Sequence, residues 1–136
     1  MDSAKLISLE DAPQRIPFAS TLCITGHRPE KLPKGEQLEA LLHAMEYQLE
    51  QIAPLGFRYF LTGMADGIDY YAAHHLFEMR RSNPDIKVIG VSPCSDYRAF
   101  YVRHGYCVPH LDELEACIDG CIVLPGSSRS GGVFLK

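Results

Sequence analysis

The sequence predicts an α/β domain built on a doubly wound, mainly parallel sheet of about four to five strands, with helices on both faces. Short apolar runs alternate with helix-like segments, a pattern typical of parallel strands joined by helical crossovers. The apolar runs are nearly continuous, as expected for strands that are buried on both faces. Three of them end in polar loops that contain glycine, at the sheet edge where such folds bind ligands.

The first half of the chain supplies two predicted strands and two predicted helices. Residues 21–25 (TLCIT) form a short apolar run, followed by the loop GHRPEKLPKG with its two prolines and two glycines. Residues 57–61 (FRYFL) form the second strand, and the turn TGMADG leads into a helix over 68–81. Between the strands, one apolar stripe at helical spacing predicts a helix that ends before Pro54 and Gly56. Its members are Leu38, Leu41, Leu42, Met45, Leu49 and Ile52.

The second half of the chain continues the alternation. Its predicted elements are a third strand at 86–91 (IKVIGV), helices at 97–106 and 111–117, and a fourth strand at 121–124 (CIVL). The loop PGSSRSGG follows the fourth strand. Residues 1–20 are weakly patterned and interrupted by two prolines, so we expect an extended lead-in to a single domain over residues 21–136.

Composition excludes several classes of protein. The 136 residues are 46% hydrophobic and 22% charged, which is typical of one globular domain and not of a disordered chain or a disulfide-rich miniprotein. The net charge of -4 argues against a general nucleic-acid coat. No apolar run approaches the roughly 20 residues of a membrane span, and the charged N-terminus is unlike a signal peptide. The five cysteines are scattered, so we expect reduced thiols and a cytoplasmic protein.

The three glycine-containing loops have the chemistry of a phosphate site. Glycine lets the backbone approach a ligand closely, and the loop 63–67 runs directly into a helix whose N-terminal N–H groups attract anions. Residues 126–132 add hydroxyls, and Arg28 is suited to clamping a phosphate. The set favours a nucleotide, although tight strand-to-helix turns need glycine whatever they bind. Neither a Walker lysine motif nor a GxGxxG fingerprint is present.

Each candidate residue has a structural interpretation beside the functional one. His27 is a candidate general acid or base, or it merely shapes the turn. Asp66 and Asp69 are candidate ribose-binding or catalytic carboxylates, and the alternatives are helix capping and favourable charge in a first turn. A carboxylate in the first turn, such as Asp69, is expected to face the loop.

The sequence indicates no metal site and no cofactor. Three residues near one another, His104, Cys107 and His110, have a spacing that suggests metal ligands. They lack a fourth partner, and a glycine and a proline separate them, whereas zinc sites usually show tighter pairs. We interpret this spacing as incidental.

Three segments resemble a known family. TLCITGHRPEKLP resembles the opening of YpsA-like proteins of the SLOG superfamily, which often begin with a strand and a Gly-His-Arg-Pro-type loop. LTGMADGIDYYAA resembles the second SLOG signature and the G-x-A-x-G-I-D-x-x-A segment of the DNA-processing protein DprA. CIDGCIVLPGSSRSGG resembles the third SLOG element, a strand followed by a glycine-rich loop. The resemblance covers residues 21–132 and implies a Rossmann-like fold that binds a nucleotide or nucleotide-derived small molecule, as a sensor or accessory protein.

The resemblance also implies the residues of the site and two alternative functions. One alternative is a nucleotide N-glycosidase like the LOG-type phosphoribohydrolases, with Asp66 or Asp69 as general base. The catalytic glutamate of that family's glycine loop is missing here, because no glutamate follows Gly132. The other is single-stranded DNA binding as in DprA, which the negative net charge disfavours. The implied ligand-binding residues are Gly26, His27, Arg28, Gly63, Asp66, Gly67, Asp69, Ser130, Gly131 and Gly132.

The end of the chain departs from the family pattern. Val133 stands where a threonine usually follows the glycines, and only four residues follow Gly132. The family fold continues at this point with a helix and usually another strand. We therefore expect that the C-terminal part of the fold is missing. A second subunit is then expected to cover the exposed sheet face, which predicts a homo-oligomer such as a dimer.

Overall fold

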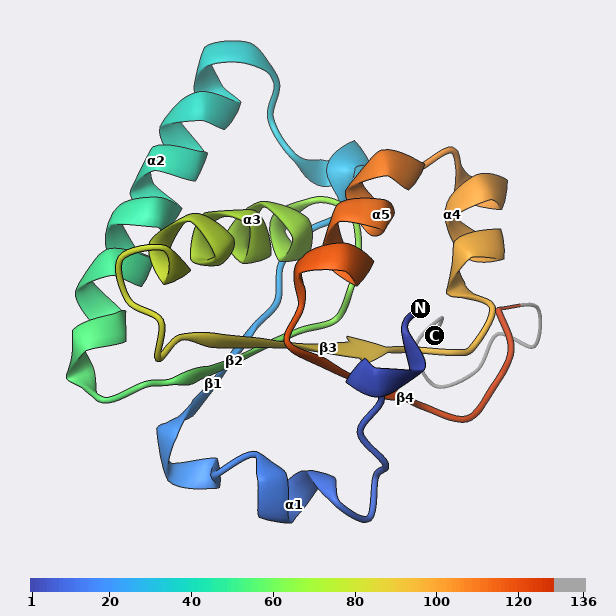
Figure 1. Ribbon diagram of the computed structural model, residues 1–136. Helices are drawn as coiled ribbons and strands as arrows, with labels where there is room; N and C mark the ends of the chain where they lie inside the picture. The colour runs from blue at the N-terminus through green and yellow to red at the C-terminus, as the bar shows by residue number, and fades with distance from the viewer. Residues whose placement is uncertain (129–136) are drawn as a thin grey trace.

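The computed structural model describes residues 1–128 and shows an α/β fold on a four-stranded parallel sheet (Figure 1). The strands lie side by side in chain order, β1-β2-β3-β4. Thr21 is paired with Tyr59, and Ile89 with Gly120, in parallel register. The prediction of a Rossmann-like α/β fold is confirmed. The strands are β1 (Thr21–Ile24), β2 (Tyr59–Thr62), β3 (Lys87–Ser92) and β4 (Gly120–Val123).

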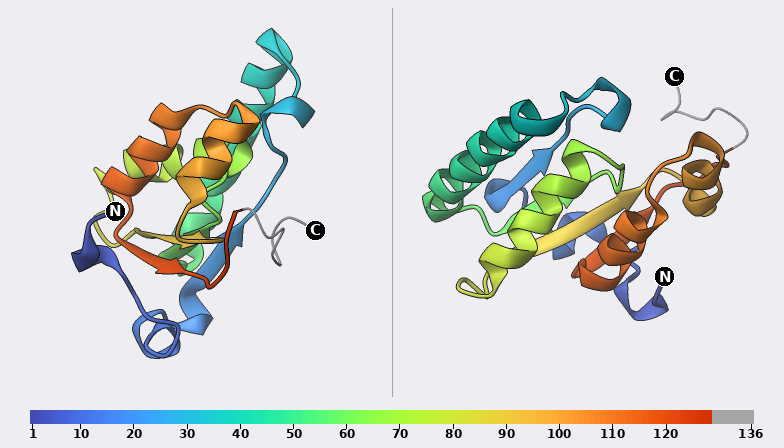
Figure 2. Two further views of the ribbon diagram at one scale, coloured as in Figure 1. Left: turned by 90° about the vertical axis from the view of Figure 1, so that its right-hand side faces the viewer. Right: turned by 90° about the horizontal axis from the view of Figure 1, so that it is seen from above.

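The helices form one main layer over the sheet. It consists of α2 (Gly35–Ile52), α3 (Ile68–Arg80), α4 (Tyr97–His104) and α5 (Val108–Cys117), and the short helix α1 (Ala12–Arg15) lies on the opposite face (Figures 1 and 2). Because right-handed crossovers in an unreversed strand order all pass over the same side of a sheet, the four larger helices share one face. The carboxyl ends of all four strands consequently open toward one edge of the domain.

Two elements differ from the expectation of deep burial. β1 is an edge strand, and the side chain of Cys23 is exposed rather than buried. The helix α2 begins three residues before the apolar stripe, and its first turns project beyond the sheet (Figure 1). Of the stripe, only Leu49 is buried, and Leu41 is 39% exposed. An edge position gives β1 and α2 neighbours on one side only.

The first twenty residues are folded against the sheet rather than simply extended. The backbone N–H of Ile7 donates to the carbonyl of Cys121 over 2.8 Å, which joins the segment to β4. Ile7 and Ile16 are buried with Ile89 and Ile122 beneath the sheet. The segment therefore forms part of the apolar core on the face opposite the main helical layer.

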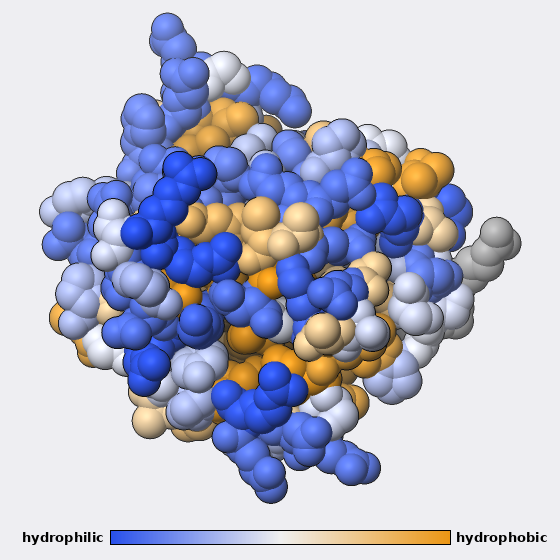
Figure 3. All heavy atoms as spheres, in the orientation of Figure 1, coloured by the Kyte–Doolittle hydropathy of each residue, from blue (hydrophilic) through white to orange (hydrophobic). Residues whose placement is uncertain are grey.

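The larger apolar core lies between the sheet and the four main helices. Its fully buried members come from every layer and include Phe60, Val88, Leu76, Tyr101 and Leu114. On the surface, hydrophilic side chains alternate with apolar ones, and one apolar band runs between the sheet and α1 (Figure 3). Within residues 1–128, no helix has the length and apolar character needed to cross a membrane.

Candidate functional site

The loop after β1 lies directly against the start of α3, and two glycines make this possible. Gly67 has a φ of +92°, and a Cβ placed there would fall on the carbonyl oxygen of His27. A Cβ on Gly26 would lie 2.5 Å from Ile68 Cγ2. The N–H of Ile68 donates to the carbonyl of His27 over 3.0 Å. The predicted glycines are thus required for packing the two loops together, whatever ligand they hold.

Asp69 lies where these two loops meet. Asp69 is only 6% exposed, and a Cβ placed on Gly63 would lie 2.8 Å from the Oδ2 atom of Asp69. Burial raises the pKa of Asp69 from 3.8 to about 6. The backbone N–H groups of Gly26, Gly63 and Ala65, which face the carboxylate, oppose that shift, and so does the positive charge of Arg28. The Oδ1 atom is buried and has no hydrogen-bond partner within residues 1–128.

Arg28 is placed by aromatic side chains that sequence analysis did not assign to the site. Its guanidinium carbon lies 4.9 Å from the ring centroid of Phe100 on α4 and 5.9 Å from that of Tyr106. Such cation–π contacts restrain the side chain while leaving its N–H groups available. The hydroxyl of Tyr106 donates to Glu30 over 2.8 Å, which fixes the second ring. The only sequence signal for this role was the aromatic content of the predicted helix at 97–106.

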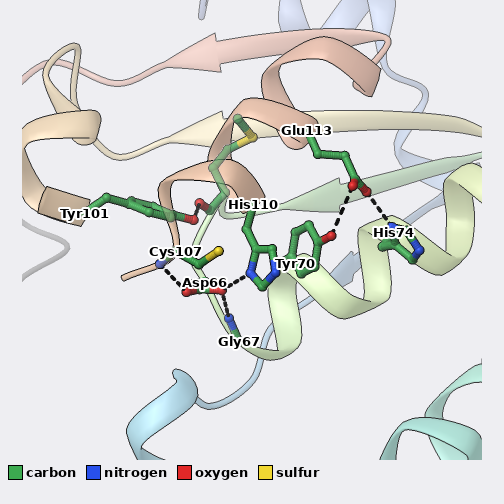
Figure 4. A network of polar contacts seen from close by, with 9 residues as sticks. Asp66, Gly67, Tyr70, His74, Tyr101, Cys107, His110 and Glu113 are labelled. Carbon is green, nitrogen blue, oxygen red and sulfur yellow. Dashed lines mark hydrogen bonds and ion pairs between the residues drawn. The ribbon is translucent and has the colours of Figure 1, made fainter. Parts of the chain in front are cut away.

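Asp66 is held inside the structure by its own neighbours (Figure 4). It is 4% exposed, and its carboxylate accepts from the N–H groups of Gly67 and Cys107, each over 2.9 Å. His110 Nδ1 lies 2.8 Å from Asp66 Oδ1, and its ring stacks on Tyr70 at 3.7 Å between centroids. Both oxygens of Asp66 therefore have partners, and these contacts fasten the loop after β2 to the start of α5. This geometry favours a structural role for Asp66 over ligand binding, but that role is not the predicted capping of α3, because Gly67 is the N-cap residue and its N–H is the donor that bonds to Asp66 there.

Further contacts from α4 and α5 fix the same loop and helix (Figure 4). The hydroxyl of Tyr101 donates to the carbonyl of Met64 over 2.6 Å. Met64 has a φ of +63°, which is unusual for a residue with a side chain, so this bond stabilises an otherwise unfavourable turn. Glu113 on α5 accepts from Tyr70 and pairs with His74, both on α3. We call these contacts, together with those of Asp66 with Cys107 and His110, the loop clamp.

The remaining predicted residues are placed as follows. The side chain of His27 is exposed, and the loop packing uses its carbonyl. The three residues whose spacing resembles that of metal ligands are divided, because Cys107 and His110 contact Asp66, whereas the His104 ring lies 4.2 Å from that of Phe100. In the part of the chain that the structure describes, no group of three His, Cys, Asp or Glu side chains is arranged to hold a metal ion.

The loop after β4 is anchored at its first residues. Ser128 donates to Asp96 from both its backbone N–H, over 2.9 Å, and its hydroxyl, over 2.8 Å. These bonds lower the pKa of Asp96 to about 2. Arg103 on α4 donates to the carbonyl of Ser128 over 2.7 Å. The predicted site residues Ser130, Gly131 and Gly132 lie outside the described residues.

No protein-family model matches the sequence, and no curated protein is significantly similar to it.

Proposed function

We propose that this chain binds a nucleotide or a nucleotide-derived small molecule at the carboxyl ends of β1 and β2, as a sensor or accessory protein. The observation that carries the proposal is the buried Asp69 carboxylate, which has one oxygen without a partner among residues 1–128 and lies where two glycine loops meet near Arg28. Buried polar atoms without a partner are rare in folded proteins, and perturbed acids cluster at functional sites.

Arg28 supplies the group expected to hold the phosphate. A guanidinium presents several N–H donors in one plane, which matches two oxygens of a phosphate. The rings of Phe100 and Tyr106 restrain that plane before any ligand arrives, which lowers the entropy lost on binding. The N-terminus of α3 adds favourable partial positive charge at the same edge.

Thermal unfolding against a panel of nucleotides tests this proposal. The panel contains nucleoside mono-, di- and triphosphates, ADP-ribose and NAD. A ligand present at 100 times its dissociation constant adds about 2.7 kcal/mol, which raises the midpoint of a domain this size by several degrees. We expect such a shift with at least one compound, and we expect Arg28→Ala to abolish it. Arg81→Ala, at an exposed position at the end of α3, is the matched control and retains it. A panel without any shift contradicts the proposal.

A nucleotide N-glycosidase is the second candidate, and the pKa of Asp69 is the observation that favours it. A carboxyl group with a pKa of about 6 can exchange a proton near neutral pH, as a general acid or base requires. Incubation with nucleoside monophosphates and chromatography of the products tests this candidate. Release of free base that Asp69→Asn abolishes supports it, and no release at high protein concentration eliminates it.

A further inference from the structure

We propose that Asp69 is a specificity residue that accepts a hydrogen bond from a ribose hydroxyl, so that the site prefers ribonucleotides to deoxyribonucleotides. This inference rests on the proposed function and names the sugar that the site selects. It follows from the position of one atom. Asp69 Oδ1 is buried and unpartnered within residues 1–128, although the same carboxylate faces backbone N–H groups of both loops.

A buried carboxylate oxygen without a donor is costly, because it has lost its hydration without gaining a hydrogen bond. The neighbouring buried acid, Asp66, does not lack hydrogen-bond donors. Asp66 is equally buried, and both of its oxygens have donors. Asp69 therefore differs from Asp66 in having an oxygen, Oδ1, that can accept a further hydrogen bond. The ligand group that complements it is a hydrogen-bond donor.

The chemistry of a nucleotide limits which group that donor is. Phosphate oxygens accept hydrogen bonds, so the phosphate pairs with Arg28 and cannot satisfy Asp69. The ribose hydroxyls donate hydrogen bonds, and the ribose is bonded directly to the phosphate. Asp69 is 6% exposed, and Gly26 and His27 in the adjoining loop are exposed. Exocyclic amines of the bases are the other donors, and the experiment separates them from the sugar.

The test compares sugars at constant base. Binding of each of the four common ribonucleoside 5′-monophosphates is measured by calorimetry beside its 2′-deoxy and 3′-deoxy counterparts. A site that bonds a hydroxyl rejects the analogue that lacks it, because its own polar group is then left unpaired. We expect removal of one of the two hydroxyls to weaken binding by at least about tenfold, whichever base is attached. Equal affinity for all three sugars overturns the inference and leaves the proposed function standing.

The protein variants assign that preference to one residue. In Asp69→Ala the ribonucleotide and the deoxyribonucleotide are expected to bind equally, whereas a merely structural Asp69 would weaken both and keep their ratio. Asp85→Asn, at an exposed turn before β3, is the control that keeps the wild-type ratio. A preference that persists in Asp69→Ala overturns the inference.

Two further outcomes are decisive. If Asp69→Ala fails to fold, the wild-type series and Asp69→Leu decide, because leucine is similar in size and has no hydrogen-bond acceptor, and an unchanged sugar preference in Asp69→Leu then overturns the inference. Absence of binding by every nucleotide tested, ribo or deoxy, overturns the proposed function and this inference together.

Discussion

At the scale of single residues, Asp69 is an acid that the fold buries at a cost. Its folded pKa of about 6 lies above its ordinary value of 3.8, so the folded chain holds this proton more tightly than the unfolded chain. The contribution to stability is therefore fully present below about pH 4 and is lost as the pH rises through 6. Such a cost is typical of residues kept for function.

Asp69→Asn is predicted to remove this pH dependence. One pKa unit corresponds to about 1.4 kcal/mol. Ionisation of Asp69 therefore lowers the wild-type free energy of unfolding by about 2–3 kcal/mol between pH 4 and pH 8. Denaturant unfolding of both proteins at the two pH values measures it. We expect the fall in stability between pH 4 and pH 8 to shrink by that amount in the variant. Parallel pH profiles would show that Asp69 ionises normally.

Arg28→Ala is predicted to weaken nucleotide binding while leaving the fold largely intact. Loss of a charge-assisted hydrogen bond to phosphate costs roughly 1.5–3 kcal/mol of binding free energy. Loss of its partly buried cation–π contacts costs the fold about 1–2 kcal/mol. Calorimetric titration and thermal unfolding of the same samples separate the two effects. A lowered melting temperature with unchanged affinity would make Arg28 a structural residue.

At the scale of elements, the loop clamp explains why α4 and α5 matter to a site built on β1 and β2. Asp66→Ala leaves the N–H of Cys107 and the His110 ring without their acceptor. Because a buried donor that loses its partner is costly, we expect a loss of about 2–4 kcal/mol of unfolding free energy. Tyr101→Phe, which removes only the hydroxyl bond to Met64, is expected to cost about 1–2 kcal/mol. Denaturant unfolding measures both, and wild-type stability in Asp66→Ala refutes the clamp.

Sequence patterns located the elements well and their mutual contacts poorly. The turn TGMADG and the residues that follow it predicted α3 to within one residue, and the glycine loops predicted the sheet edge that holds Arg28 and Asp69. The clamp was missed because its partners are distant in sequence: Tyr101 lies 37 positions after Met64, and His110 lies 44 positions after Asp66. No local pattern encodes such a pairing. The exposure of β1 was missed for a similar reason, since strand order is set by the whole sheet.

At the scale of the whole molecule, the N-terminal segment contributes to the core beneath the sheet. Ile7→Ala is predicted to lower the free energy of unfolding by about 2–4 kcal/mol, because it opens a cavity against Ile89 and Gly120. Leu9→Ala is the matched control, since Leu9 is 51% exposed and its loss is expected to change little. Equal effects of the two substitutions on denaturant unfolding would show that the segment does not pack on the sheet in solution.

The association of this chain into a homo-oligomer such as a dimer stays a prediction. The expected homo-oligomer is tested by sedimentation velocity over a range of concentrations. A dimer that forms at micromolar concentration supports the expectation, and a monomer at every concentration refutes it.

Backbone NMR during titration with adenosine 5′-monophosphate and ADP-ribose tests whether the loops after β1 and β2 form a nucleotide site. We expect saturable shifts of the amides in the range 26–28 and in the range 63–69, including those that face Asp69. Amides at the opposite end of the sheet, near Asp85 and Asp119, should remain unchanged. Shifts confined to that opposite end, or none with either compound, would show that these loops do not form a nucleotide site.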